Sequence, residues 1–270
     1  MVNEILLGAG VGAALGLTGS GGVLAVPALI LGLGFTLPEA VPVSLIAIGS
    51  ASLIGTIEGL KQGLVRYRAA MVMAGAGVLF SPLGIWLSHV LPADIAMLMF
   101  CLLLFFIVGR TARQAASGRT TAEGEVPQAR NCMLRPDTGR FRWNPRCFAT
   151  MSGIGSLSGL FSGMFGVGGG FLIVPGVRQF SDLSMHSIVA TSLAVITLIS
   201  AGTITSALMH GVVIEPRSWW FIGATVTGLV IVRRLVPALP GHYLQWGFAA
   251  LTAAVSVSLF IKTLISMLPV

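Results

Sequence analysis

Charged residues are scarce in this 270-residue chain, where they make up only 9% of the sequence. Apolar residues account for 55%, and the mean hydropathy is +0.92. A water-soluble core could not enclose that much apolar surface, so lipid must be the solvent for most of it. The composition therefore argues against a soluble protein and predicts an all-α integral membrane protein in a lipid bilayer.

Cysteine is also scarce, with three residues in the whole chain. Cys101 lies inside an apolar segment, while Cys132 and Cys147 have no histidine between them and no CxxC spacing. We expect unpaired thiols, with no metal site and no disulfide framework. Neither glycine run is followed by the Gly-Lys-Ser/Thr of a nucleotide-binding loop, which argues against ATP-driven pumping. No catalytic residue and no cofactor is predicted.

The net charge of +7 comes from sixteen Lys and Arg residues against nine Asp and Glu residues. Eight of the sixteen lie in residues 110–147, and most of the others are at the ends of apolar segments. This distribution orients a membrane protein rather than forming a phosphate-binding face, so we expect no nucleic-acid partner. Residues 1–4 contain no basic residue, and we interpret the first apolar stretch as retained rather than as a signal peptide.

The chain contains the same membrane unit twice. Three glycines recur 147 residues later, which pairs Gly8, Gly12 and Gly16 with Gly155, Gly159 and Gly163. A glycine-rich break follows each set, and after it the offset becomes 148: Pro27 with Pro175, Ser44 with Ser192, Gly63 with Gly211, Gly75 with Gly223 and Pro92 with Pro240. The duplication divides the chain into a first membrane repeat (1–109), an arginine-rich linker (110–147) and a second membrane repeat (148–270).

Each repeat contains five candidate apolar segments. They are residues 4–18, 22–35, 39–60, 69–90 and 93–109, then 148–165, 170–180, 186–209, 218–236 and 242–264. The first two segments of each repeat are shorter than the roughly 20 residues that a full span needs. Together they form either one glycine-broken helix that crosses the membrane or a re-entrant hairpin, followed by three transmembrane helices. Crossing helices make the two repeats parallel, whereas hairpins make the second repeat inverted.

The basic residues favour the inverted arrangement. It places fourteen of the sixteen on the linker side and leaves Arg217 and Lys262 opposite. The parallel arrangement places thirteen on the linker side but sends Arg233 and Arg234 across the membrane. Because cytoplasmic loops are rich in Lys and Arg, we expect inverted repeats with a cytoplasmic linker. Inverted repeats also supply alternating access by symmetry.

The glycine breaks are the predicted chemical centre of the protein. Backbone that abandons helical hydrogen bonding at membrane depth is tolerated only where it lines a cavity or is buried in protein. Freed N–H groups before a helix N-terminus form a cradle for an anion. The alternative is that these glycines only permit close packing or a tight turn. The predicted substrate-binding residues are Thr18, Gly19, Ser20, Gly21, Gly22, Ser44, Gly166, Gly168, Gly169, Gly170, Thr191 and Ser192.

Other patterns have simpler interpretations. Glycine at every fourth position forms a flat stripe, which favours helix packing over ligand contact. The serine and threonine hydroxyls beyond the breaks either touch a substrate oxygen or bond to their own helix backbone. Glu58 and Lys61 either form a local surface pair or place a functional carboxylate at membrane depth. The histidines lie near segment ends, where interfacial hydrogen bonding is favoured over a proton relay: His89, His186, His210 and His242.

The sequences around the two breaks resemble those of the sulfite exporter TauE/SafE family of membrane permeases. Residues 16–27 read GLTGSGGVLAVP, and residues 163–175 read GMFGVGGGFLIVP. Residues 190–193 and 210–213 are similar to the central helix of the family's second repeat and to its end. The first repeat departs from this pattern at Pro42 and at Gln62, where the second repeat has Ala190 and His210.

The resemblance implies an integral membrane transporter for small anions that are often sulfur-containing, such as sulfite, sulfoacetate or other organosulfonates. The leading hypothesis is a secondary transporter of the cell (inner) membrane that works by alternating access and is not an enzyme. The alternatives are a passive anion channel and a non-transporting membrane assembly protein. A homodimer is compatible with the glycine stripes, because they could pack between subunits as well as within one.

Overall fold

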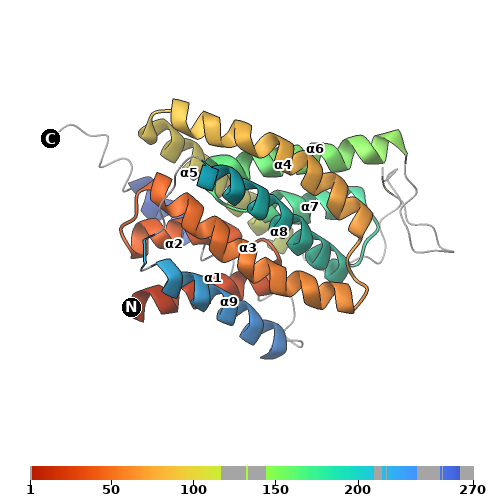
Figure 1. Cartoon of the computed structure of the whole chain (residues 1–270), viewed down its shortest axis with the longest axis horizontal. Helices are drawn as coiled ribbons and strands as arrows, with labels where there is room; N and C mark the ends of the chain where they lie inside the picture. Colours follow the sequence, from red (N-terminus) through yellow and green to blue (C-terminus); the bar gives the residue numbers. More distant parts are fainter. Residues whose placement is uncertain are drawn as a thin grey trace.

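The structure is a computed structural model that describes residues 2–116, 132, 144–209, 215–216, 218–235, 250 and 252–261. Within these residues the chain is helical between short connections (Figure 1). The helices are α1 (Val2–Thr18), η1 (Gly21–Leu24), α2 (Ala25–Gly32), α3 (Leu37–Lys61), α4 (Tyr67–Val90), α5 (Ala93–Ala116), α6 (Pro145–Phe165), α7 (Gly170–Phe180), α8 (Met185–Met209) and α9 (Ser218–Leu235). A further helix covers Thr252–Ile261. Both α5 and α6 extend into the range that composition assigned to the linker.

Three of the described helices are long and apolar enough to cross a membrane: Leu37–Lys61, Tyr67–Val90 and Met185–Ala207. This is fewer than the three per repeat that we expect, and α9 carries two arginines in its last turn. Large apolar side chains such as Leu79 and Trp86 lie exposed on the bundle. Exposed apolar surface of this kind suits lipid better than water. The described residues thus form the all-helical, membrane-suited protein that the composition predicts.

Local sequence explains where the helices begin and end. The backbone N–H and hydroxyl of Thr36 donate to a Glu39 carboxylate oxygen at 2.9 and 2.8 Å, which forms a capping box at the start of α3. Pro145 occupies the first turn of α6, where a missing N–H costs nothing. The same helix ends at Gly166, whose φ of 68° is left-handed and therefore favours glycine.

The first repeat begins with a hairpin rather than with a helix that crosses. Glycine has no β-carbon, so the atoms that an added β-carbon would strike are the atoms packed against that glycine. On Gly21 these are backbone atoms of Leu15, and on Gly32 they belong to the side chain of Leu7. The later residue, Gly32, contacts the earlier part of α1, so α2 runs antiparallel to α1. Of the two arrangements that the sequence leaves open, the first repeat therefore has the hairpin.

The second repeat begins in the same way. A β-carbon on Gly169 would lie 2.7 Å from the Ser158 side chain, and one on Gly176 would lie 2.9 Å from Ile154. Helix α7 therefore returns along α6, as α2 returns along α1. The two hairpins are equivalent in sequence and in structure.

The central helices α3 and α8 occupy equivalent positions in the two repeats and cross each other in opposite directions. A β-carbon on Gly49 would lie 2.9 Å from the Ser200 side chain, and one on Gly59 would lie 2.9 Å from Ala190. The residue later in α3 contacts the residue earlier in α8, so the two helices are antiparallel. Residues or helices at equivalent positions of the two repeats are called repeat mates below. The repeat mates α3 and α8 thus form the centre of the bundle (Figure 1).

The remaining helices are exchanged between the repeats. Helix α1 packs on α9 at the bottom of the view in Figure 1, and α6 packs on α4 at the top. β-Carbons on Gly12 and Gly159 would meet the carbonyl oxygens of Thr225 and Gly77. The prediction that the glycine stripes serve helix packing is therefore confirmed. Because these stripes are occupied within one chain, they give no support to a homodimer, which stays a prediction.

The expectation of unpaired cysteines is wrong for two of the three. Cys132 and Cys147 form a disulfide across 15 residues, and both are buried. The N–H of Cys132 donates to the Phe180 carbonyl oxygen at 3.1 Å, which holds this point of the linker beside the end of α7. The thiols meet because Cys132 lies beside the end of the second hairpin, a tertiary contact that the spacing of the two cysteines does not reveal.

Candidate functional site

The two glycine breaks meet inside the bundle although they are far apart in the sequence. A β-carbon built on Gly22 would lie 2.9 Å from the carbonyl oxygen of Val167. One built on Gly170 would lie 2.7 Å from the carbonyl oxygen of Gly19. Residues 166–170 are all buried. The tips of the two hairpins are therefore in backbone contact, which side chains at these glycines would prevent.

Each tip rests on the central helix of the other repeat. The Ser44 hydroxyl, on α3, donates to the carbonyl oxygen of Gly166 at 2.8 Å. Its repeat mate Ser192, on α8, has its Oγ 3.1 Å from the β-carbon position of Gly19 and donates to Val189 of its own helix at 2.8 Å. The structure thus brings both predicted serines to the breaks, and Ser44 bonds to one of them directly.

Unpartnered N–H groups make the second break a candidate binding site. The N–H of Gly166 donates to the Ser162 carbonyl oxygen at 2.9 Å. The next three N–H groups, those of Val167, Gly168 and Gly169, donate to no other residue in the described part of the chain. Nearly every buried backbone N–H has a partner, so three buried donors in a row indicate a place for a polar ligand. Helix α7 begins directly after them, and its N-terminus adds positive potential.

The first break satisfies more of its own donors. The Thr18 hydroxyl donates to the Ala14 carbonyl oxygen at 2.8 Å and lies 3.2 Å from both the N–H and the hydroxyl of Ser20, which donate to it. The N–H of Gly19 donates to the Leu15 carbonyl oxygen at 2.9 Å. The N–H groups of Gly21 and Gly22 are also buried and donate to no other described residue, so the first tip offers two such donors opposite the three of the second.

Thr191 has a different partner from the other predicted residues. Its hydroxyl accepts the N–H of Arg66 at 3.1 Å and so anchors the connection between α3 and α4 to α8. Of the predicted substrate-binding residues, the structure gathers those of the two breaks together with Ser44 and Ser192. The hydroxyl of Thr191 instead accepts a hydrogen bond that joins α8 to the connection between α3 and α4.

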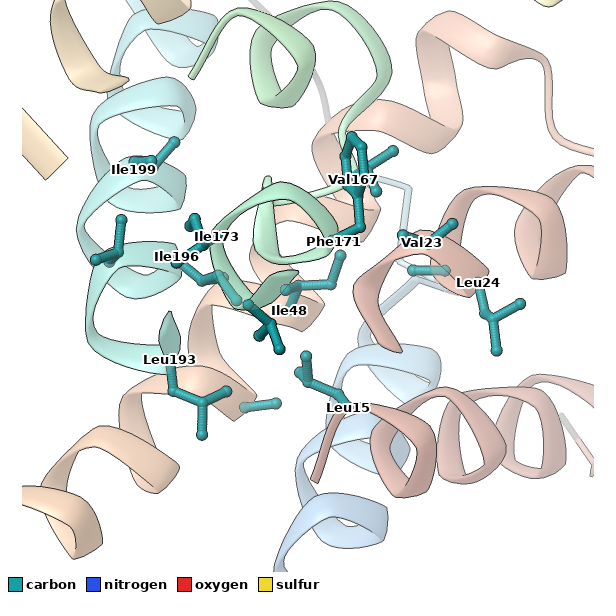
Figure 2. Close-up of a cluster of buried hydrophobic side chains, with 14 of the residues drawn as sticks. Leu15, Val23, Leu24, Ile48, Val167, Phe171, Ile173, Leu193, Ile196 and Ile199 are labelled. Carbon is teal, nitrogen blue, oxygen red and sulfur yellow. The ribbon is translucent and has the colours of Figure 1, made fainter. Parts of the chain in front are cut away.

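Two isoleucines that the sequence did not single out fill the space beside the tips. A β-carbon on Gly168 would lie 3.1 Å from Ile48 and 3.3 Å from Ile196. Figure 2 shows both side chains among apolar residues from the breaks and the central helices, including Val167 and Phe171. Both isoleucines are buried. They are 148 residues apart, so the repeat offset is the signal that could have identified them.

The sulfite exporter TauE/SafE family matches residues 5–259 of the sequence. The chain belongs to this family. A probable membrane transporter protein of Xylella fastidiosa (strain Temecula1 / ATCC 700964) is 28% identical over 94% of this chain and 93% of its own length. One from Xylella fastidiosa strain 9a5c is 29% identical over 83% and 81%. The probable membrane transporter protein MamO of Paramagnetospirillum magneticum is 25% identical over 90% of this chain and 41% of its own length. No solved structure matches the chain.

In this TauE/SafE protein the carboxylate of Glu58 reaches across to another helix. It lies 3.2 Å from the guanidinium of Arg233 on α9, which also donates to the Gly55 carbonyl oxygen at 2.9 Å. Sequence spacing suggested Lys61 as the partner, but the structure joins α3 to α9 instead. In the described residues no group of three or more His, Cys, Asp and Glu side chains could hold a metal ion. His210 and His242 lie outside the described residues.

Proposed function

We propose that this family member is a secondary transporter that moves small anions across the cell (inner) membrane, and we assign it no catalytic role. The observation that carries the proposal is the run of buried, unpartnered N–H groups at Val167, Gly168 and Gly169, where the two tips meet. Donors ahead of a helix N-terminus favour an anion and disfavour a cation. We assign the substrates to sulfur-containing anions, namely sulfite, sulfoacetate or other organosulfonates, on the strength of the family description.

The relation between the repeats supports alternating access as the mechanism. The repeat mates α3 and α8 run antiparallel, and each hairpin tip docks on the central helix of the other repeat. We propose that the repeats are inverted across the membrane, so that exchanging their conformations exposes the site to the opposite side. Ile48 and Ile196 fill the space at the tips, so no open path is left there for an anion. This favours a carrier, which must change conformation to release its substrate, and disfavours a permanently open anion channel.

The orientation follows from charge. The ion pair of Arg233 with Glu58 joins the C-terminal ends of α9 and α3, so these two ends share a side. The inverted arrangement predicts this, whereas the parallel arrangement separates them. We place this side and the linker 110–147 in the cytoplasm, because basic residues collect on the cytoplasmic face of membrane proteins.

Thermal unfolding of the purified protein with added anions tests the proposal. Sulfite or sulfate at one hundred times its dissociation constant should stabilise the protein by about 2.7 kcal/mol, and sodium or ammonium with an inert counter-anion should not. The Gly168→Ala variant should lose most of this stabilisation, because the added methyl group crowds Ile48 and Ile196 at the tips.

Gly34→Ala is the matched control. Gly34 has a φ of 74°, close to the 71° of Gly168, but nothing lies within 4 Å of its β-carbon position. Both variants carry the same left-handed strain, so only a role at the tips separates them. In liposomes, a carrier shows faster labelled-sulfite exchange when sulfite is present on both sides, whereas a channel does not. A cation or neutral solute that stabilises the protein more than every anion tested would overturn the proposal.

A further inference from the structure

Two buried hydroxyls on the central helices have no hydrogen-bond partner. Ser52 on α3 and Ser200 on α8 are both fully inaccessible to solvent. Neither Oγ has a partner among the described residues. The two serines are 148 residues apart, so they are repeat mates, and each repeat contributes one of them.

Other hydroxyls on the same helices have partners. Ser50 donates to the Ile46 carbonyl oxygen at 2.7 Å, and Thr197 donates to that of Leu193 at 2.8 Å. Bonding to the carbonyl one turn earlier is the usual solution for a hydroxyl inside a helix. Thr56, Ser44, Ser192, Thr203 and Thr205 likewise donate to a carbonyl of their own helix. Ser52 and Ser200 depart from this pattern at equivalent positions, which points to a shared role rather than to a local accident of packing.

The two serines lie next to the meeting point of the hairpin tips. Ser52 follows Ile48 by four residues and Ser200 follows Ile196 by four, so each serine shares a helix face with the isoleucine that packs on the breaks. The Ser200 side chain also lies 2.9 Å from the β-carbon position of Gly49, at the crossing of α3 and α8. The pair is therefore placed where the two central helices and the tips come together.

We propose that Ser52 and Ser200 are substrate-binding residues that donate hydrogen bonds to one oxyanion, one hydroxyl from each repeat. This inference rests on the proposed anion transport and adds a second set of donors to the N–H groups of the second break. Hydroxyls are neutral donors, so they hold an anion without the tight ion pair that a lysine or arginine would form. A carrier needs binding of this kind, because the anion must leave as readily as it enters.

Sulfite and sulfate affinity of the full-length protein, measured from thermal shifts against concentration, tests the pair. Ser52→Ala and Ser200→Ala should each weaken binding about tenfold, since each removes one hydrogen bond to a charged group. The double variant should weaken binding further. Without anion, all three should melt at or above the wild-type temperature, because no protein hydrogen bond is lost. Ser50→Ala is the control and should bind as the wild type does.

Each other outcome has a distinct meaning. Wild-type affinity in both Ser→Ala variants, with anion binding and flux intact, would overturn the role of the pair and leave the transport proposal standing. A lower melting temperature with unchanged affinity would also overturn it, because the hydroxyls would then be structural. If neither sulfite nor sulfate binds to or is transported by the wild type, both proposals fail. Ser52→Cys and Ser200→Cys, whose thiols are weak donors, replace any alanine variant that does not express.

Discussion

At the scale of the residue, Arg233 shows how one side chain joins the two repeats. Its guanidinium is half-buried and bonds to both Gly55 and Glu58, whereas Lys61 at the end of the same α3 helix is exposed. We expect Arg233→Ala to lower the free energy of unfolding by about 1.5–3 kcal/mol, because a carbonyl and a carboxylate lose a charged donor. Thermal unfolding in detergent measures this loss.

The control for this prediction is Lys61→Ala. An exposed side chain without a buried contact should change stability by less than about 0.5 kcal/mol. If Lys61→Ala were as damaging as Arg233→Ala, the local pair with Glu58 that the sequence suggested would be the better description.

The sequence identified the residues of the breaks but not all of their neighbours. Glycine-rich runs at matched positions predicted where the hairpin tips would be. The offset of 148 paired Ser44 with Ser192 and so identified both as candidates. Ile48 and Ser52 also have identical residues 148 positions later, but isoleucine and serine are ordinary residues in a membrane helix, so this match alone did not single them out. Their importance depends on which face of α3 meets the tips and on a missing hydrogen bond, and both are tertiary properties.

At the scale of the element, the pair formed by α1 and α9 depends on direct backbone contact. We expect Gly12→Ala to destabilise the protein by about 1–3 kcal/mol, because its β-carbon would overlap the carbonyl of Thr225. Gly10→Ala on the same helix should be neutral, since nothing lies within 4 Å of that position. Melting temperatures and detergent-extracted yield check both. Equal effects at the two positions would contradict the packing of α1 on α9.

The elements themselves were largely predictable, and their pairing was not. Runs of apolar residues marked the helices, because lipid-exposed helices must be apolar over most of their length. The choice between a crossing helix and a hairpin depended on contacts such as that of Gly32 with Leu7, which local sequence does not specify. The disulfide of Cys132 with Cys147 was missed for the same reason.

At the scale of the whole molecule, the duplication explains why the candidate site lies at the centre. Each repeat supplies one hairpin and one central helix, and neither can complete the contact between tips alone. The exchange of α1 and α6 onto the opposite repeats ties the two halves together. A relative movement of the repeats must therefore act on the tips, where Gly22 touches Val167 and Gly170 touches Gly19.

Single cysteines placed by Arg119→Cys and Arg234→Cys, in a background of Cys101→Ser, Cys132→Ser and Cys147→Ser, test the orientation of the whole molecule. An impermeant maleimide should label both only after the membrane is opened, and Arg217→Cys should be labelled in intact cells. The reason is the excess of basic residues, which places fourteen of sixteen on the cytoplasmic side in the inverted arrangement. The background without an added cysteine shows how much label attaches to other residues, and the same protein with Cys132 and Cys147 restored shows whether these two thiols react by themselves.

The possible results separate orientation from symmetry. If Arg234→Cys alone is labelled from outside, the two repeats are not inverted. If Arg119→Cys and Arg234→Cys are both labelled from outside and Arg217→Cys is not, the repeats are inverted but face the other way. The disulfide of Cys132 with Cys147 makes this comparison necessary, because disulfides persist in oxidising compartments and are rare in the cytosol. A cytoplasmic linker therefore predicts that this bond is reduced in growing cells, and that it forms only after the protein is extracted into oxidising buffer.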